Sequence, residues 1–157
     1  MKLRLLPFFF LFLFISCTTL EVCDDNYDSL LVIKFKTFDS EELIVDTIVS
    51  DVTLYGIREG KSDSLLYNVE STSWLELPLD PDHTYSRFVL NINEKSDTLH
   101  MVHSTGYYLI NYTCGYGALF NLDSMVYGGT LFYGDTIINS VIDAELEEYE
   151  EHIWIYF

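Results

Sequence analysis

The chain has 157 residues and carries 25 acidic against 8 basic residues, a formal net charge of −17. Nucleic-acid binding depends mainly on Lys and Arg neutralising phosphates, so this balance excludes DNA and RNA as partners. Hydrophobic residues make up 49% and aromatic residues 16% of the chain, far more apolar mass than a disordered acidic tail carries. The composition therefore predicts one folded domain of ordinary size.

The first sixteen residues have the layout of a secretory signal peptide. A short basic start with Lys2 and Arg4 precedes an apolar run over residues 5–15, shorter than the roughly 20 residues that cross a bilayer. The next residues place a small side chain before Cys17, which resembles the lipobox of bacterial lipoproteins, although Phe14 stands where Leu is usual. The resemblance implies cleavage before Cys17 and lipid attachment to its thiol. The alternative is an ordinary signal peptide with an incidental cysteine.

The expected mature chain has two parts. Residues 17–28 form a lipidated, acidic linker, and residues 29–157 form a single domain. Removing residues 1–16 takes away two basic residues and no acidic one, so the net charge becomes −19. These features predict an outer-membrane lipoprotein that is attached to the membrane through lipid on Cys17. The sequence leaves open whether it faces the periplasm or the cell surface.

Two cysteines remain once Cys17 carries lipid. Cys23 and Cys114 make an even number in an oxidising compartment, and the simplest pairing is a disulfide between them. This cross-link would close a loop of 91 residues. Loop-closure entropy assigns it about 4 to 5 kcal/mol as an upper figure. The alternative is a redox-active or nucleophilic Cys114, for which the sequence supplies no neighbouring basic residue to activate the thiol.

From residue 29 onward the chain consists of short apolar or alternating segments that turn residues interrupt. Strands are predicted at 30–38, 49–58, 64–69, 73–77, 84–92, 98–103, 107–113, 118–122, 125–127, 136–142 and 152–157, the last pairing within the core. Hairpin turns are predicted at 60–63, 93–96 and 127–130. Residues 144–151 are acidic on every side, which predicts a loop or a turn of helix. The pattern favours an all-β fold, an antiparallel β-sandwich with Greek-key, immunoglobulin-like or similar connections.

The first predicted strand shows the alternation of apolar and polar residues most clearly. Ile33, Phe35 and, less strictly, Phe38 should share a buried face. Lys34 and Lys36 should lie on the opposite, exposed face.

Five short motifs follow one another along the chain. They are Cys23 before the apolar strand at 31–35, Leu77-Pro78-Leu79, Asp97-Thr98-Leu99, Cys114-Gly115 and Ile155-Tyr156-Phe157. Their order resembles a family of small Bacteroidota lipoproteins classed as a domain of unknown function, over most of residues 23–157. The chain departs from that pattern at Thr113, where an acidic residue is usual. The resemblance implies the sandwich and the disulfide, and it brings no catalytic residue.

No segment predicts a catalytic, cofactor or metal site. The sequence has neither a Gly-x-Ser-x-Gly elbow nor a glycine-rich phosphate loop. His100 and His103 lie three residues apart on one predicted strand and so face opposite sides. Asp80 and Asp82 offer carboxylates to a hard cation, but the loop around them lacks the further oxygen ligands, and a turn explains them better. We therefore expect a non-enzymatic protein without cofactor or metal.

Triplets of Asp, then Ser or Thr, then an apolar residue are unusually frequent. Six occur, where template counting on this composition gives about one. The triplet resembles the acceptor motif of Bacteroidota protein O-glycosylation, which implies modification of at least one central hydroxyl. The central residues are Ser29, Thr47, Ser64, Thr98, Ser124 and Thr136. The structural alternative is that Asp ends a turn and a β-former opens the next strand.

Three functional hypotheses follow. The first is a lipid-anchored, non-enzymatic envelope lipoprotein that acts as a binding or structural accessory module, with an unknown envelope protein or glycan as partner. The second is a carbohydrate-binding module with an exposed aromatic stacking platform, unless those rings belong to the core. The candidate rings are Trp74, Tyr107, Tyr108, Tyr112 and Tyr116. The third is a small hydrolase, which requires a cleft holding His with Asp or Glu within hydrogen-bond reach.

Overall fold

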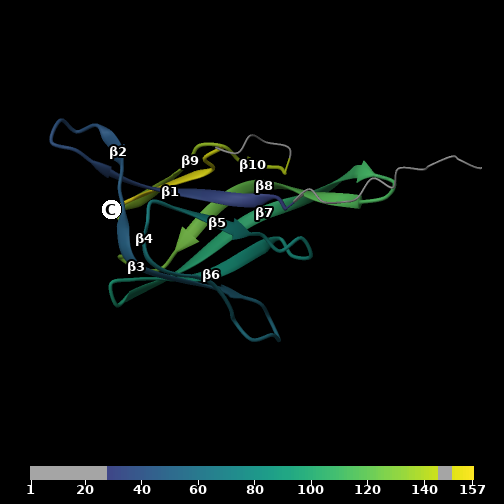
Figure 1. Ribbon diagram of the computed structural model, residues 1–157, viewed down its shortest axis with the longest axis horizontal. Helices are drawn as coiled ribbons and strands as arrows, with labels where there is room; N and C mark the ends of the chain where they lie inside the picture. Colours follow the sequence, from purple (N-terminus) through teal and green to yellow (C-terminus); the bar gives the residue numbers. More distant parts are fainter. Residues whose placement is uncertain (1–27, 145–149) are drawn as a thin grey trace, which may run out of the picture.

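The computed structural model describes residues 28–144 and 150–157 (Figure 1). All regular elements in these two ranges are β-strands, and no helix there has the length and apolar character needed to span a membrane. The strands are β1 Leu30–Phe38, β2 Ile44–Asp46, β3 Val49–Ile57, β4 Ser64–Thr72, β5 Trp74–Pro78, β6 Tyr85–Ile92, β7 Lys95–Asn111, β8 Gly115–Tyr127, β9 Gly134–Ile137, β10 Val141–Ile142 and β11 Ile153–Tyr156. The predicted all-β fold is confirmed.

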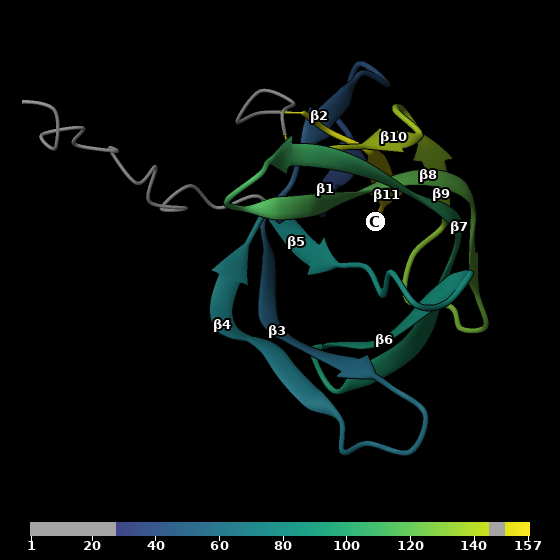
Figure 2. The ribbon, with the colours of Figure 1, turned by 90° about the vertical axis from the view of Figure 1, so that its right-hand side faces the viewer.

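The strands form two sheets that pack face to face, which confirms the predicted β-sandwich. The five-stranded sheet has the order β2-β1-β11-β9, and β5 also pairs with β1. The six-stranded sheet has the order β10-β8-β7-β6-β3-β4, and Figure 2 shows it curving around the core. All strand pairs are antiparallel except β1 with β11, which run parallel.

One hydrophobic core fills the space between the sheets. In β1, Leu31, Ile33 and Phe35 alternate with outward-facing residues and are fully buried. Ile153 and Ile155 of β11 pair beside them and are also fully buried, so the last strand lies in the core as predicted. Burying a side chain of this size contributes about 1.5 to 3 kcal/mol.

The end of β1 departs from the predicted alternation in two places. Phe38 is 56% exposed and stacks on Tyr156, with ring centroids 5.7 Å apart. Lys36, expected on the exposed face, is buried. Its Nζ atom lies 2.6 Å from Asp46 Oδ1 and 4.5 Å from the centre of the Trp154 ring. Neighbouring strands supply these contacts, so the alternation along β1 does not indicate them.

The ion pair of Lys36 attaches the short edge strand β2 to β1. Burial alone would lower the pKa of Lys36, but the hydrogen bond to Asp46 and the charge of Glu151 outweigh burial and raise that pKa. The same hydrogen bond lowers the pKa of Asp46. Both groups are therefore charged throughout the neutral pH range.

Two pairs of predicted short strands are each one long strand. β7 runs through residues 104–106, where the Ser-Thr-Gly sequence predicts a break. β8 likewise continues through Asp123 and Ser124. The two strands pair with each other along almost their whole length. Each satisfies the backbone hydrogen bonds of the other at residues such as Gly106 and Asp123, which have low strand propensity on their own.

The predicted turns have mixed outcomes. The hairpins at 60–63 and 93–96 are confirmed, and Asn93 and Glu94 both adopt the positive φ of a type I′ turn, 47° and 66°. The hairpin predicted at 127–130 is wrong, because the chain there crosses from β8 to β9 in the other sheet. The strand predicted at 136–142 is two short strands in different sheets, and β2 has no counterpart among the predicted strands. Residues 145–149 lie outside the described ranges.

Candidate functional site

A cavity of about 200 Å³ opens where the ends of β3 and β6 meet the loop between β5 and β6. Its apolar part is lined by Gly56, Leu66, Pro78 and Phe88. Gly56 pairs with Phe88 across the two strands. A side-chain carbon added at Gly56 would lie 3.5 Å from Leu66 Cδ1, so the absence of a side chain at this position leaves the space open.

Charged side chains form much of the remaining cavity wall. Arg58 and Arg87 both line it, and they are the only arginines in residues 17–157. Arg58 Nε lies 3.5 Å from Asp80 Oδ2, and Arg87 Nη2 lies 3.6 Å from Glu59 Oε1. Both separations exceed the roughly 2.7 to 2.9 Å of a tight charged hydrogen bond. Within each pair the opposite charges therefore neutralise each other, but the hydrogen-bond donors and acceptors of the two side chains are not saturated.

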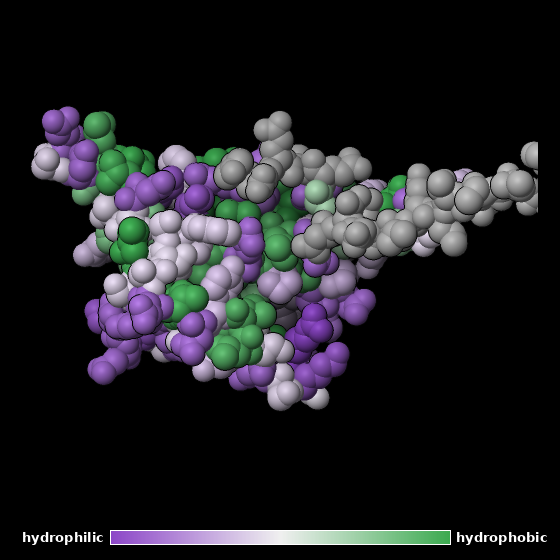
Figure 3. All heavy atoms as spheres, in the orientation of Figure 1, coloured by the Kyte–Doolittle hydropathy of each residue, from purple (hydrophilic) through white to green (hydrophobic). Residues whose placement is uncertain are grey.

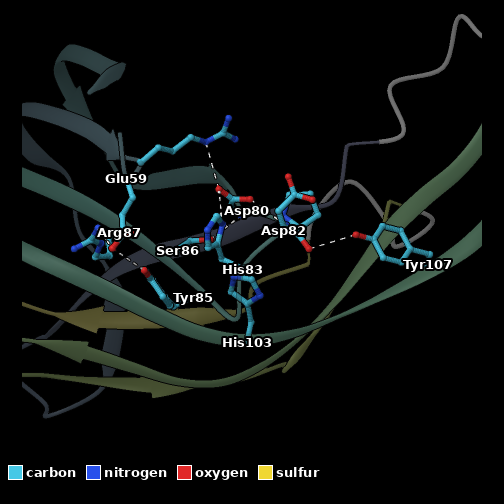
Figure 4. Close-up of polar contacts among 11 residues, drawn as sticks. Glu59, Asp80, Asp82, His83, Tyr85, Ser86, Arg87, His103 and Tyr107 are labelled. Carbon is cyan, nitrogen blue, oxygen red and sulfur yellow. Dashed lines mark hydrogen bonds and ion pairs between the residues drawn. The ribbon is translucent and has the colours of Figure 1, made fainter. Parts of the chain in front are cut away.

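Two rings flank these charges (Figure 4). His83 Nδ1 lies 3.4 Å from Asp80 Oδ2, and the His83 ring is 5.9 Å from that of Tyr85. The Tyr85 hydroxyl donates to Glu59 Oε1 over 3.2 Å. Burial alone would raise the pKa of Asp80, but the hydrogen bonds from Asp82 N–H and His83 and the charge of Arg58 outweigh it and lower that pKa. Asp80 is therefore ionised at neutral pH.

A serine and a histidine lie together at the inner side of the cavity. Ser86 Oγ accepts the backbone N–H of Asp80 over 2.7 Å and lies 3.0 Å from His103 Nε2. Burial lowers the pKa of His103, which is only 1% exposed, so this imidazole is neutral. Among the described residues, no group hydrogen-bonds to His103 Nδ1. The described part of the site thus has a Ser–His pair without the carboxylate that orients the base in a catalytic triad.

Sequence reasoning found only part of this cavity. It singled out Asp80 and Asp82 as a turn, and Arg58, Glu59 and Arg87 were missed because they come from separate segments that only the fold brings together. The one usable signal was the scarcity of arginine in so acidic a chain. Across residues 28–144 and 150–157, no group of three or more His, Cys, Asp or Glu is placed to hold a metal ion.

The five candidate aromatic residues do not form one platform. Tyr107, Tyr112 and Tyr116 are 61%, 98% and 72% exposed and belong to the far end of the β7–β8 hairpin. Tyr108 is half-buried. Trp74 is exposed but lies on β5 in the other sheet, where its ring faces Lys34 Nζ at 5.8 Å. Three of the five rings therefore gather at one place.

Of the three cysteines, Cys114 is the one that lies in the described residues. Cys114 lies between β7 and β8 and is disulfide-bonded. Cys17 and Cys23 lie outside the described residues, so the Cys23–Cys114 pairing stays a prediction. Asp28, the first described residue, lines the same surface hollow as Cys114 and Tyr116.

The six triplet hydroxyls differ in accessibility. Ser29 is buried and its hydroxyl donates to the carbonyl of Ala118. Ser64 and Thr136 are exposed. The remaining three, which are Thr47, Thr98 and Ser124, are half-buried. In the folded domain, Ser64 and Thr136 are the most accessible of the six.

A further group of exposed apolar side chains lies around β2. Leu43, Ile44 and Ile48 are 58%, 45% and 72% exposed. Figure 3 shows hydrophobic residues at this projecting corner next to hydrophilic ones. Acidic residues interrupt the group on both sides, which breaks up any continuous apolar surface.

Comparison with known proteins adds a family and no activity. Neither a curated protein nor a solved structure matches the chain. The model of a family of unknown function, DUF6452, matches residues 51–157. This range contains the whole charged cavity and all the quoted motifs from Leu77 onward, whereas Cys23 and the strand at 31–35 precede it. The chain therefore belongs to the family of unknown function DUF6452.

Proposed function

We propose that this protein is a lipid-anchored, non-enzymatic binding module of the outer membrane. The lipobox-like sequence before Cys17 supports the anchor, and the disulfide-bonded Cys114 is in keeping with an oxidising compartment outside the cytoplasm. The observation that carries the binding role is the convergence of Arg58, Arg87, Asp80 and Glu59 on one cavity. Charged groups of both signs around an otherwise apolar hollow are typical of a ligand site.

The charges of the cavity favour a neutral, polyhydroxylated ligand. An anion that approached the arginines would also meet Asp80 and Glu59, and a cation would meet the arginines. A sugar hydroxyl both donates and accepts, so it can bond to a carboxylate and a guanidinium at once. The rings of His83 and Tyr85 lie beside these groups, and the Arg87 guanidinium lies 5.5 Å from the centre of the Tyr85 ring. A sugar can pack its apolar face against aromatic rings of this kind. We therefore propose a neutral carbohydrate as the ligand class.

The size of the cavity limits the ligand. At about 200 Å³ it is smaller than the roughly 300 to 1,000 Å³ of sites for drug-sized molecules. It suits a single sugar residue, such as the end of a glycan chain, better than a buried oligosaccharide.

The cavity holds a histidine beside a carboxylate, with His83 Nδ1 3.4 Å from Asp80 Oδ2, but its serine, Ser86, contacts His103 instead. The Ser86–His103 pair favours binding over hydrolysis. A serine nucleophile must give its proton to the imidazole, which in turn needs an acceptor for its other nitrogen. Ser86 is 5% exposed and already accepts the N–H of Asp80. These two features support a structural role in which the pair holds the loop that carries Asp80.

The carbohydrate proposal is tested by saturation-transfer NMR and titration calorimetry with neutral monosaccharides and their uronic-acid counterparts. We expect neutral sugars to bind and Arg58→Ala to weaken that binding about ten-fold or more, because a charged hydrogen bond contributes about 1.5 to 3 kcal/mol. Gly56→Val should also weaken binding, by filling the cavity. Lys61→Ala, on the exposed β3–β4 turn, serves as the control. Binding that is absent, equal in all variants, or stronger for uronic acids contradicts the proposal.

We also propose that the mature protein carries O-linked glycan on at least one triplet. Ser64 and Thr136 are the exposed candidates, and Thr136 is the one that lies outside the lining of the proposed binding cavity. The expected result is an intact mass, from the native host, that exceeds the lipidated polypeptide by whole sugar units. Ser64→Ala or Thr136→Ala should remove the mass of the glycan that the replaced hydroxyl carries. A mass that equals polypeptide plus lipid alone contradicts this prediction.

A further inference from the structure

The far end of the β7–β8 hairpin is a chain segment without charged side chains in a strongly acidic protein. Residues 104–122 contain no Asp, Glu, Lys or Arg, although the chain carries 33 such residues in all. At this end Leu109, Tyr112 and Tyr116 are 46%, 98% and 72% exposed, and they are called the hairpin end below. Leu109 and Tyr116 are directly paired, so their side chains share one face of the hairpin.

The hairpin end lies where the chain enters the domain. Asp28 lines the same hollow as Tyr116. Asp28 lies only 11 positions after Cys17. A chain of that length spans at most about 40 Å when fully extended. A Cys23–Cys114 disulfide would shorten the tether to six positions, or about 20 Å.

We propose that the hairpin end docks onto the lipid surface that holds the anchor, with Tyr112 and Tyr116 at the level of the headgroups. This inference rests on the lipid anchor of the proposed function. Tyrosine is enriched at membrane interfaces because its ring is apolar and its hydroxyl is polar. Leu109, Tyr112 and Tyr116 carry no charge, and Asp28 is the acidic residue that lines the same hollow as Tyr116. Anionic headgroups therefore repel this end of the hairpin less than they repel the acidic surface elsewhere.

The tether makes even weak docking effective. Because the domain is anchored, its contact with its own membrane is an intramolecular event. For short linkers the effective concentration of the two surfaces is on the order of millimolar. Three exposed side chains are therefore enough to orient the anchored domain on the membrane, although they would be too few to bind a free protein to it. Docking would hold the domain in one orientation on its membrane.

A sugar is a less suitable occupant of the hairpin end. Sugar sites rely on side-chain amides and carboxylates beside the stacking rings. Within residues 107–116 the single side-chain amide is that of Asn111. Its Oδ1 atom already accepts the backbone N–H groups of Thr113 and Cys114, over 2.8 and 2.7 Å. Tyr107 is also exposed at this end of the hairpin, but its hydroxyl already donates to the Pro81 carbonyl over 3.3 Å.

The test places a fluorescent reporter at the hairpin end of the full lipidated protein. Tyr112→Trp is compared with Tyr133→Trp, a matched control that is 89% exposed and outside the hairpin. Both are reconstituted into vesicles of phosphatidylcholine and phosphatidylglycerol, and the emission of the unaltered protein, with Trp74 and Trp154, is subtracted. We expect the Tyr112→Trp signal to shift to the blue and to be quenched by lipids brominated near the headgroup. The Tyr133→Trp signal should do neither.

Equal, water-like emission from the two reporters in a protein with lipid on Cys17 overturns docking and leaves the anchor standing. Mass spectrometry of the N-terminal peptide checks that lipid separately, and its absence overturns the anchor and the docking together. A Tyr112→Trp shift that appears only on adding a monosaccharide or an envelope protein overturns the lipid assignment in favour of that partner.

Discussion

Replacing Asp97 with Ala should lower the free energy of unfolding by about 3 kcal/mol. Asp97 is 4% exposed, and its Oδ1 atom accepts three backbone N–H groups. The donors are Thr98, Gly129 and Gly128, at 2.7, 2.9 and 3.2 Å. Alanine would leave these buried donors without an acceptor, and each unsatisfied group costs about 1 to 3 kcal/mol. Water that reaches any of the donors reduces the total cost.

The bonds to Asp97 matter because they hold the crossing between the two sheets. Gly128 and Gly129 directly follow β8, where the chain leaves the six-stranded sheet for β9. A side-chain carbon at Gly129 would lie 2.6 Å from Asp97 Cγ, so glycine is required for this close approach. The buried carboxylate therefore gives the Asp97-Thr98-Leu99 motif a structural reason.

Urea unfolding of the chain from residue 18 onward measures the effect. Asp97→Asn retains an oxygen acceptor and should cost about 1 kcal/mol or less. Asp63→Ala is the matched control, because Asp63 precedes the same kind of Ser-apolar pair but is exposed. An Asp97→Ala loss no larger than that of Asp63→Ala would show that the three N–H groups find other acceptors.

The second large effect concerns pH, and stability should fall as the pH drops below about 6.5. His103 and His152 are 1% and 3% exposed, and burial lowers the pKa of each below its ordinary value of 6.5. Acidic neighbours oppose this shift without cancelling it, Asp80 and Asp123 for His103 and Glu150 for His152. The unfolded chain therefore binds protons that the folded chain does not.

The sign of the effect follows from this difference in proton uptake. The stability is fully present above pH 6.5 and is lost as the pH falls toward the lowered pKa values of the folded state. The contacts of His152 explain part of the cost, because its Nδ1 atom accepts the backbone N–H of Val32 over 3.0 Å. Protonation at Nδ1 would break that bond between β1 and the start of β11. Asp80, whose pKa is lowered, acts in a separate window below about 3.8.

Unfolding free energies between pH 8 and pH 4.5 provide the measurement. His152→Gln retains an acceptor for the Val32 N–H, and with His103→Gln it removes both titrating groups. We expect the double variant to have a much flatter dependence on pH than the wild type. Constant wild-type stability from pH 8 to 5, or an unchanged slope in the double variant, would contradict the assignment.

Local patterns in the sequence were sufficient where a segment's own residues decide its conformation. Residues 30–38 alternate clearly and form β1 with those bounds. Asn93 and Glu94 form the predicted tight turn because Asn tolerates positive φ and strand residues flank the pair. Many short apolar segments in a chain of this length also predicted two packed sheets correctly.

Local patterns failed where a distant strand supplies the decisive contact. Gly106 reads as a break but lies inside β7, because β8 pairs with it through Leu119. Lys36 reads as a surface residue but is buried, because Asp46 and Trp154 cover its ammonium group. In each case the interaction with the distant partner outweighs the residue's intrinsic conformational preference, which amounts to about 1 kcal/mol or less.

The sequence by itself determined the all-β class, the acidic surface, the candidate lipid anchor and most strand positions, because composition and periodicity are properties of neighbouring residues. Only the tertiary structure decided which residues form a site. The cavity joins Arg58 from the end of β3, Asp80 from the β5–β6 loop and Arg87 from β6. The hairpin end becomes a surface only because β7 and β8 pair beyond the core. Both arise from pairings between segments far apart in the chain, and no local pattern records such pairings.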